Sequence, residues 1–411
     1  MFHMESRTDE WIYDWNIVGV KPNINKKVQL DDESLRDGLQ SPSITDPPIE
    51  GKLKLVRLME KLKIDSADIG FPGASPKMVN DVTQICQMIK DDKMKISPNV
   101  ACRTHEADIL PAIEIAHKVD IELEVAAFIG SSPIRQYVEN WPIEKLLELS
   151  QNAIKLCIEN DMPVMFVTED TTRARPQDLE KLYLSAVELG AQAVCLSDTV
   201  GHATPQGTHN LVTFIRQILD DAGFKNIRID WHGHRDRGLS LANAFAAINA
   251  GADRIHGTGI GIGERCGNTP MDQLLVNLKL YGYINRDLSA LSEYTQTVSE
   301  LVKIPIPANY PVIGVDAFRT TTGVHAAAII KARQKGEIWA DTVYSGVPAA
   351  DFGLNQKIEI GPLSGMSNVK YKLKEMNIEL SNEKAEELLS YTKKLGRMIE
   401  EQEIRNFIEI N

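Results

Sequence analysis

The stretch IRIDWHGH, residues 227–234, decides the fold. Its apolar residues alternate with polar ones, the pattern of a β-strand whose side chains point to opposite faces. If the isoleucines and the tryptophan face covering helices, Asp230, His232 and His234 face inward, with both imidazoles at the carboxyl end. A parallel α/β barrel builds its active site at that end. The histidine spacing alone fits a metal site and two ordinary polar loop residues equally well, so the neighbouring motifs must decide between these two interpretations.

Strand candidates of this kind recur along the chain and alternate with amphipathic helices, which is typical of repeated βα units around a parallel sheet. The eight candidates are residues 28–32, 67–70, 95–101, 121–127, 163–168, 193–197, 227–231 and 254–257. Eight such units match a closed (β/α)₈ barrel better than an open doubly wound sheet. We therefore predict an α/β protein built on a TIM barrel.

The pattern changes after residue 300. Three prolines in the stretch 304–311 rule out a regular helix and indicate an extended linker. Beyond it, we expect a short helix over 322–333 and a charged helix over 382–407. The predicted division of the chain is an N-terminal arm over 1–25, a catalytic TIM barrel over 26–300, and a linker with a mainly helical C-terminal subdomain over 301–411.

Composition narrows the class of partner. The 411 residues carry a formal net charge of −12, which disfavours nucleic acid and anionic membranes. The five cysteines are odd in number and lack C-x-x-C spacing, which argues against a disulfide framework and a thiolate zinc site. With neither a targeting segment nor an apolar run of about 18 residues in view, we expect a cytoplasmic enzyme that acts on small molecules.

Polar motifs follow five of the predicted strands. They are LRDGLQ at 35–40, EDT at 169–171, SDTVG at 197–201, the histidine pair, and GTGIGIGERCGN at 257–268. Together they offer a carboxylate, two imidazoles and an amide oxygen, which suit a divalent cation with open positions for substrate oxygens. Such a centre acts as a Lewis acid on a carbonyl group.

These motifs resemble those of the 2-isopropylmalate synthases and their relatives, the homocitrate and citramalate synthases, which are HMGL-like metal-dependent TIM barrels. The resemblance rests on LRDGxQ, His-x-His, GIGERxGN and the later TGVH at 322–325, and it extends from about residue 28 to 374. It implies an acyltransferase that condenses acetyl-CoA with a 2-oxo acid and hydrolyses the thioester to a 2-alkylmalate. It also implies a homodimer with partly shared active sites.

The resemblance assigns roles to particular residues. The implied metal ligands are Asp37, His232, His234 and Asn268. This ligand set admits Mg²⁺, Mn²⁺ and Zn²⁺ alike. The resemblance places Arg36 where negative charge develops during the reaction. It places Glu169 and His325 around the acetyl group and does not decide which of the two is the general base. Implied substrate contacts are Gln40, Asp68, Ala126, Thr199, Gly263 and Glu264.

Each of these assignments competes with a purely structural explanation. Arg36 would then pair with acids at the barrel mouth, and Thr199 would cap a helix. Glu169 would pair with Arg173, and His325 would lie on a solvated helix face.

The glycines of the 257–268 loop do not indicate a dinucleotide site, because no ribose-binding acid lies about 20 residues further on. Close backbone approach to the substrates explains them better. We expect Cys266, in the same loop, to be a small buried filler.

Several positions depart from the synthase pattern. Leu39 replaces a glutamate, Asp68 is one methylene shorter than the usual residue, and Ala126 replaces a histidine. Arg235 and Arg237 add two cations near the mouth. We therefore predict a 2-oxo acid that is larger, more polar or more anionic than 2-oxoisovalerate.

Two other functions are weighed against the synthase. Leu39 resembles the hydroxymethylglutaryl-CoA lyase branch, whereas the GERxGN loop opposes a lyase. A catalytically inactive metal-binding paralogue is disfavoured by the intact set of predicted ligands. Because the sequence ends at Asn411, without the domain through which leucine inhibits long synthases, we expect feedback control to be absent or different.

Overall fold

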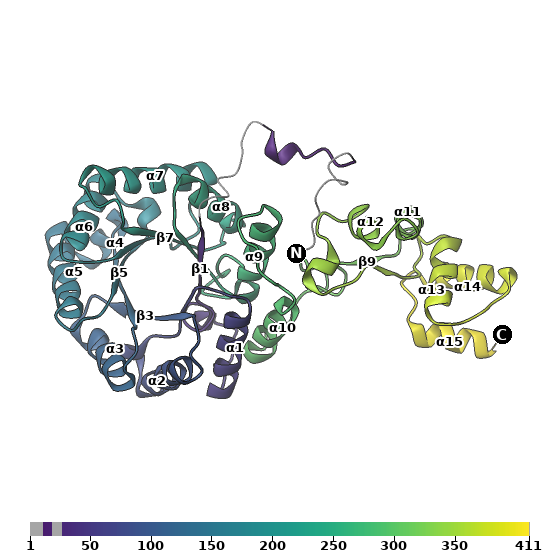
Figure 1. The fold of residues 1–411 in the computed structure, drawn as a ribbon, viewed down its shortest axis with the longest axis horizontal. Coiled ribbons are helices and arrows are strands. Elements are labelled where there is room, and N and C mark those ends of the chain that lie inside the picture. The colour runs from purple at the N-terminus through teal and green to yellow at the C-terminus, as the bar shows by residue number, and fades with distance from the viewer. Residues whose placement is uncertain (1–10, 19–26, 411) are drawn as a thin grey trace. The chain divides into compact units, whose positions relative to one another are not determined.

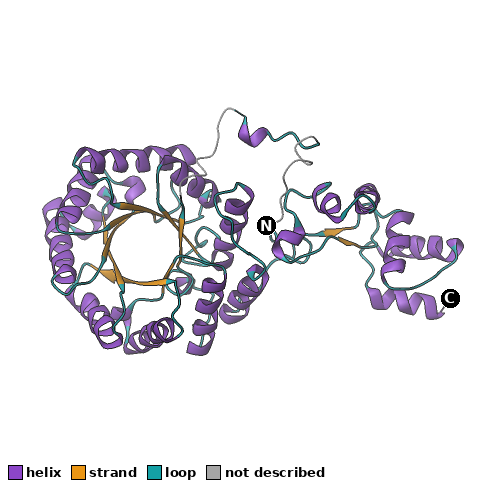
Figure 2. Ribbon diagram, in the orientation of Figure 1, coloured by secondary structure: helices purple, strands orange, loops and turns teal. Residues whose placement is uncertain are grey.

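The computed structural model describes residues 11–18 and 27–410. Its centre is a closed barrel of eight parallel strands in sequential order, in which β1 also pairs with β8 (Figures 1 and 2). The strands are β1 Gln29–Asp32, β2 Ser66–Asp68, β3 Ser97–Arg103, β4 Glu124–Gly130, β5 Val164–Glu169, β6 Ala193–Asp198, β7 Arg228–Gly233 and β8 Arg254–Gly257. The predicted TIM barrel is confirmed.

Helices surround the strands on the outside of the barrel (Figure 2). They are α1 Ile49–Lys61, α2 Pro76–Asp91, α3 Glu106–Val119, α4 Pro133–Glu139, α5 Ile143–Ile158, α6 Pro176–Glu188, α7 Pro205–Asp221, α8 Ser240–Ala250 and α9 Met271–Leu280. Helix α7 begins with a proline behind an N-cap, Thr204, whose side chain accepts from the Gly207 N–H. No helix in the described residues has both the length and the apolar character that a bilayer span needs.

Strand β7 places its side chains as its alternation predicts. Ile229 and Trp231 are fully buried, whereas Asp230 and His232 hydrogen-bond to groups of β8 and of the segment after β1. A one-residue shift in register would exchange these two sets of side chains. The apolar pattern therefore fixes the histidines on the inner side.

A network of buried and half-buried charged side chains lies at the amino end of the barrel. Glu124 contacts Arg228 at 2.6 Å through Oε1 and Arg254 at 2.7 Å through Oε2. Asp230 contacts the same arginines at 2.8 Å through Oδ1 and 2.5 Å through Oδ2. Each carboxylate oxygen therefore has an arginine partner, and the two positive charges hold the pKa of Asp230 below its usual value despite its burial.

The described chain divides into two compact units. The first runs to Arg286 and includes Leu301–Lys303, and the second comprises Asp287–Glu300 and the chain from Ile304 onward. The remaining elements are α10 Leu291–Val302, β9 Arg319–Thr320, α11 Gly323–Arg333, α12 Glu337–Thr342, β10 Lys357–Ile358, α13 Met366–Glu375, α14 Asn382–Leu395 and α15 Glu401–Ile410. The arm predicted over 1–25 falls largely outside the described residues.

The second unit differs from its prediction in two respects. The charged helix expected over 382–407 is two helices, because Gly396 ends α14 at a φ of 66°, a left-handed conformation that glycine adopts readily. Helices α12 and α13 were not expected in a segment that contains several glycines and prolines. Buried apolar residues of α13, α14 and α15, among them Leu373 and Leu388, form one core of this unit.

Candidate metal centre and active site

Three predicted ligands converge at the carboxyl end of the barrel. Asp37 follows β1, His232 lies on β7, and His234 follows it; all three are buried. Oδ2 of Asp37 is 3.5 Å from Nε2 of each histidine, and the two Nε2 atoms are 3.3 Å apart. Ligand atoms about 2.1 Å from one ion stand roughly 3.0 to 3.5 Å from each other. The three atoms therefore fit a single divalent cation.

The fourth predicted ligand, Asn268, adjoins this group. Its Nδ2 donates to Oδ1 of Asp37 at 2.7 Å, and its Oδ1 is buried without a hydrogen-bond partner among the described residues. The oxygen and nitrogen of an amide exchange places by rotation of the side chain. The unpartnered oxygen fits the donor set of a metal centre, and Asn268 stays the predicted fourth ligand.

The glycine loop closes on this centre. Gly263 has a φ of +150°, and a Cβ added to it would lie 2.8 Å from Oδ1 of Asp37. A larger residue would therefore displace the carboxylate. The backbone thus approaches Asp37 closely, and the N–H of Glu264 reaches Oδ1 of Asp37 at 3.4 Å. The predicted approach of the glycines to the substrates stays a prediction.

Arg36 lies among carboxylates beside the three ligands. Its Nε contacts Asp68 at 2.9 Å, its Nη1 contacts Asp37 at 3.2 Å, and its Nη2 contacts Glu33. Burial would favour loss of its proton, but Asp68 and Asp37 outweigh that effect and raise the pKa of Arg36. The guanidinium therefore stays charged and is held in one orientation.

The carboxylates around Arg36 differ in how readily they ionise. Burial raises the pKa of Asp68 to about 6, against the opposing charge of Arg36. Burial acts in the same direction on Asp37, but Arg36 and the imidazoles of His234 and His232 hold the pKa of Asp37 well below its usual range. Burial lowers the pKa of His232 well below its ordinary value. Asp37 and His232 are therefore in their metal-binding forms, anionic and neutral, at neutral pH.

Glu169 and Thr199 complete the wall of the site. Burial raises the pKa of Glu169, although the charges of Arg135 and Arg36 oppose the shift. The expected alternative partner of Glu169, Arg173, binds Asp170 instead. Thr199 does not cap a helix, because its hydroxyl accepts from the Asp170 N–H at 2.8 Å.

These side chains line one cavity of about 120 Å³. Its walls contain the three ligands, Arg36 and Glu169, together with four predicted substrate contacts besides Thr199: Gln40, Asp68, Ala126 and Glu264. The side facing β3 to β6 is largely apolar and is formed by Ala101, Ala126, Phe128, Met165, Val167 and Cys195. The structure therefore brings most of the predicted residues to one place.

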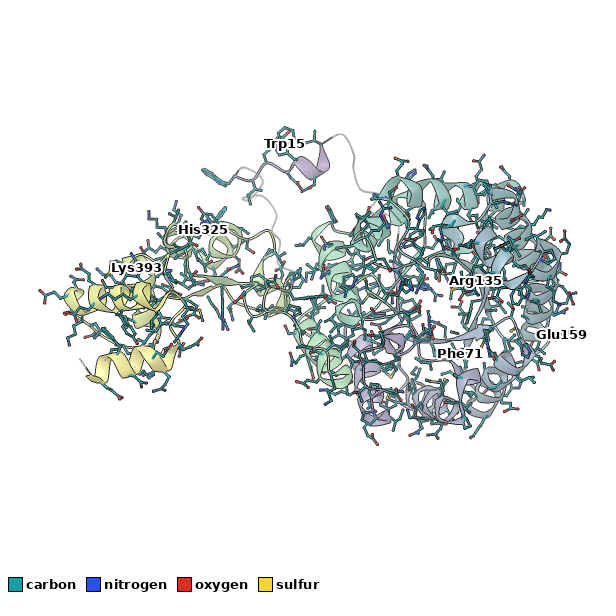
Figure 3. All side chains as sticks on the ribbon, turned by 180° about the vertical axis from the view of Figure 1, so that it is seen from behind. Trp15, Phe71, Arg135, Glu159, His325 and Lys393 are labelled. Carbon is teal, nitrogen blue, oxygen red and sulfur yellow. The ribbon has the colours of Figure 1, made fainter. Side chains whose placement is uncertain are left out.

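Four of the residues singled out from the sequence are not among those that line the cavity. His325 belongs to the second unit (Figure 3), where its ring stacks on Tyr344 with the centroids 4.1 Å apart. Arg235 and Arg237, expected near the mouth, do not line the cavity, and they donate to the carbonyls of Cys266 and His202. Cys266 is exposed, so the prediction that it is a buried filler is wrong.

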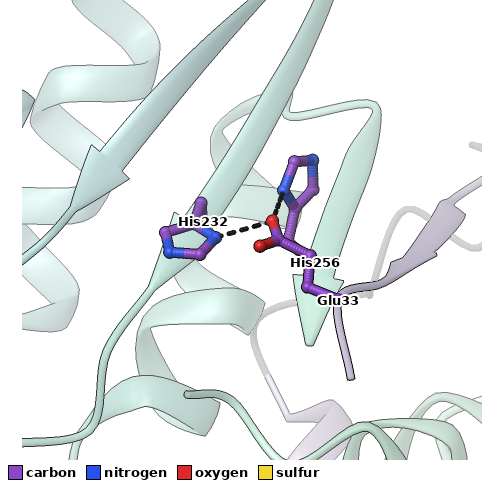
Figure 4. Close-up of side chains that lie close together, drawn as sticks. All are labelled: Glu33, His232 and His256. Carbon is purple, nitrogen blue, oxygen red and sulfur yellow. Dashed lines mark hydrogen bonds and ion pairs between the residues drawn. The ribbon is translucent and has the colours of Figure 1, made fainter. Parts of the chain in front are cut away.

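Sequence reasoning missed two buried residues beside the centre, Glu33 and His256. Oε1 of Glu33 accepts from Nδ1 of His232 at 2.8 Å and from Nδ1 of His256 at 2.6 Å (Figure 4). The alternation along β8 could have identified His256, which shares a face with Arg254. Nothing in the sequence pattern marks Glu33, because its two histidine partners lie 199 and 223 positions away.

The chain matches two families of known proteins. Residues 27–301 match the HMGL-like family, and residues 312–400 match the family of homocitrate synthase post-HMGL domain-like proteins. Solved structures resemble the fold: the HMG-CoA lyase from Brucella melitensis has a TM-score of 0.56 at 19% identity and covers 68% of this chain and 99% of its own. The hydroxymethylglutaryl-CoA lyase from Pseudomonas aeruginosa has the same TM-score at 21% identity, with 67% and 93% covered.

Curated relatives are similar over most of the chain. A probable 2-isopropylmalate synthase of Methanopyrus kandleri is 31% identical over 90% of this chain and 70% of its own length. Homocitrate synthase AksA of the same organism is 32% identical over 89% and 87%, and the 2-isopropylmalate synthase of Pyrococcus abyssi is 30% identical over 88% and 72%. With its closed barrel and its sequence match over residues 27–301, the chain belongs to the HMGL-like family.

Proposed function

We propose that this protein condenses acetyl-CoA with a 2-oxo acid and then hydrolyses the thioester, which gives a 2-alkylmalate in the manner of a 2-isopropylmalate synthase. One observation carries the proposal: the ligand triad, Arg36 and Glu169 line a single cavity at the carboxyl end of the barrel. The synthase relatives support the same reaction. The proposal includes a homodimer, and it places His325 of the second unit near the acetyl group.

The oxo acid would be held by the metal centre and by two side chains. A divalent cation on Asp37, His232, His234 and Asn268 would polarise the keto group as a Lewis acid. Thr199 accepts a hydrogen bond from a backbone N–H, which leaves its own proton to donate to the substrate carboxylate. Arg36 is fixed by three carboxylates, so its charge is already oriented toward oxygens that become negative during the reaction.

Carbon–carbon bond formation needs a base near the acetyl methyl group. Glu169 lines the cavity, and burial raises its pKa, which makes it a stronger base than an ordinary carboxylate. It would remove one methyl proton of acetyl-CoA, and the carbon would attack C2 of the oxo acid. The keto oxygen then takes a proton, and water cleaves the thioester to free CoA thiol and a carboxylate.

The walls of the cavity favour an oxo acid with an uncharged side chain. The face formed by β3 to β6 is mostly apolar, and Arg36 is the one arginine or lysine among the described residues that line the cavity. A second substrate carboxylate would therefore lie near Asp68, Glu169 and Glu264 with little compensating charge. Arg235 and Arg237 bind loop carbonyls and do not line the cavity, so our proposal does not keep the anionic preference expected from the sequence.

A panel of substrates tests the proposal. Purified protein, acetyl-CoA and Mn²⁺ are incubated with 2-oxoisovalerate, longer branched 2-oxo acids, 2-oxoglutarate and oxaloacetate, while thiol release is followed and products are identified by mass. We expect activity with the uncharged side chains. Absence of thiol release with every 2-oxo acid of the panel would contradict the synthase activity. Cleavage of 3-hydroxy-3-methylglutaryl-CoA in a parallel reaction would indicate a lyase. A preference for 2-oxoglutarate or oxaloacetate would contradict only the proposal that the side chain of the substrate is uncharged.

A further inference from the structure

We propose that Glu33 and His256 form a support for His232, which holds this ligand in its coordinating tautomer and orientation. The inference rests on the proposed metal centre and deepens it. Both residues are positioning residues, because they act through His232 and not on the substrate. We use the name imidazole support for this pair.

The backbone places Glu33 at the junction of the first and last strands. Glu33 directly follows β1, and its N–H donates to the carbonyl of Gly257, the last residue of β8, at 2.8 Å. The side chain is 2% exposed and points between β7 and β8, where Oε1 contacts both histidines (Figure 4). Its other oxygen contacts Arg36. The closure of the barrel therefore sets the position of this carboxylate.

Distances show that Glu33 is a hydrogen-bond acceptor and not a ligand of a second ion. Its Oε1 is 2.8 and 2.6 Å from the Nδ1 atoms of His232 and His256, which are ordinary hydrogen-bond lengths. Two ligands on one ion stand roughly 3.0 to 3.5 Å apart, as the Nε2 atoms of His232 and His234 do at 3.3 Å. His232 belongs to two clusters of side chains. Its cluster with Asp37 and His234 fits a metal ion, whereas its cluster with Glu33 and His256 is joined by hydrogen bonds.

This geometry determines which nitrogen of His232 carries the proton. A carboxylate accepts but does not donate, so Nδ1 of His232 donates to Glu33. Nε2 then presents its lone pair toward Asp37 and His234, from which it is 3.5 and 3.3 Å away. A carboxylate behind a ligating imidazole fixes its tautomer and raises its basicity.

His256 holds Glu33 from the opposite side. Its Nδ1 donates to Glu33, and its Nε2 is 3.0 Å from Oδ2 of Asp230. Asp230 is itself bonded to Arg254 at 2.5 Å. The imidazole support therefore connects the metal centre to the charge network at the amino end, and movement of Glu33 away from His232 would break several buried hydrogen bonds.

Metal affinity tests this inference without reference to catalysis. The full chain and its variants are titrated with Mn²⁺ by equilibrium dialysis, after circular dichroism has verified their folding. For Glu33→Ala, we expect the Mn²⁺ Kd to rise roughly 10- to 100-fold, as when a group supporting a ligand is removed. Glu33→Gln keeps the volume and one acceptor but loses the charge, so we expect an intermediate rise.

The matched control is Glu124→Gln, which removes a half-buried carboxylate that bonds two side chains, Arg228 and Arg254, at the other end of the barrel. It should be destabilised yet keep its Kd within twofold of the wild type. A Kd within twofold of the wild type in the Glu33 variants would overturn the imidazole support. If Glu33→Ala does not fold, the test uses Glu33→Gln and His256→Gln. Both variants should bind Mn²⁺ at least fivefold more weakly than the wild type. Absence of Mn²⁺ binding by the wild type would instead contradict the proposed function itself.

Discussion

The two ends of the barrel both bury charged side chains, but they balance the charges differently. At the amino end, each oxygen of Glu124 and Asp230 contacts Arg228 or Arg254. At the carboxyl end, the single guanidinium of Arg36 is shared by three carboxylates, and two imidazole nitrogens face each other. Two arginines therefore serve the carboxylates of the amino end, where Asp31 also lies 3.8 Å from Arg254, whereas one arginine serves three carboxylates at the carboxyl end. The larger excess of carboxylates over arginines suits the carboxyl end to bind a cation.

The largest expected effect comes from removing a ligand at the carboxyl end. Asp37→Asn or His232→Ala should abolish thiol release and most bound divalent metal, because the first variant removes the negative charge of the triad and the second removes one of its ligand atoms. The loss should exceed the roughly 10- to 100-fold cost of removing a group that only supports a ligand. Metal analysis and circular dichroism check this prediction, and a normal metal content in both folded variants would contradict it.

A substitution in the charge network at the amino end should lower the stability of the fold. Arg254→Met leaves the buried Asp230 and the half-buried Glu124 with Arg228 alone, and it also removes the guanidinium beside Asp31. We expect a loss of about 3–5 kcal/mol in the free energy of unfolding, measured in urea. The control Arg57→Met removes an exposed pair with Asp92 and should cost at most about 1 kcal/mol. Equal losses in the two variants would show that the buried network is not structural.

Arg36 distinguishes catalysis from metal binding within the carboxyl end. Arg36→Ala should lower turnover by about 100-fold, close to 3 kcal/mol, the scale of losing one donor to a developing oxyanion. The metal should remain bound, because Arg36 is not a ligand. Near-normal turnover would leave Arg36 with the purely structural role of pairing the acids at the barrel mouth.

A smaller effect is expected from the pH dependence of Asp68. Its pKa is about 6 in the folded chain and about 3.9 when unfolded, so the folded state holds this proton more tightly. The carboxyl therefore stabilises the fold at low pH, and this contribution is lost as pH rises toward and past 6. Relative to Asp68→Asn, the metal-free wild type should lose about 1 to 1.5 kcal/mol between pH 5 and 8. Urea titrations that give a pH-independent difference would contradict the assigned pKa.

The barrel and the ligand triad could be predicted because their signals are local. Alternation in β7 fixes the inward face, and residues that follow parallel strands meet at one end. This rule predicts the position of His232 and His234, whereas the ligand role of both histidines and of Asp37 rests on the neighbouring motifs and the family resemblance. Glu33 and His256 could not be paired in the same way, since they are 223 positions apart and meet only where β1 closes on β8.

Loop residues were harder to predict, because no periodicity fixes their directions. Cys266 was expected to be buried but is exposed, and the sequence does not show that Arg235 and Arg237 bind loop carbonyls. The break between α14 and α15 depends on one residue, Gly396, in a strongly helical sequence. Propensity summed over a window does not register such a single cap.

Pulsed EPR of the Mn²⁺-loaded chain tests the metal centre most directly, because it detects nitrogens coordinated to the ion. The account predicts one ion per chain coupled to two imidazole nitrogens, from His232 and His234, with one coupling lost in His232→Ala. Glu124→Gln at the opposite end of the barrel should leave both couplings in place. A bound ion without nitrogen coupling, or one whose couplings survive His232→Ala, would contradict the assignment of the carboxyl end as the metal centre.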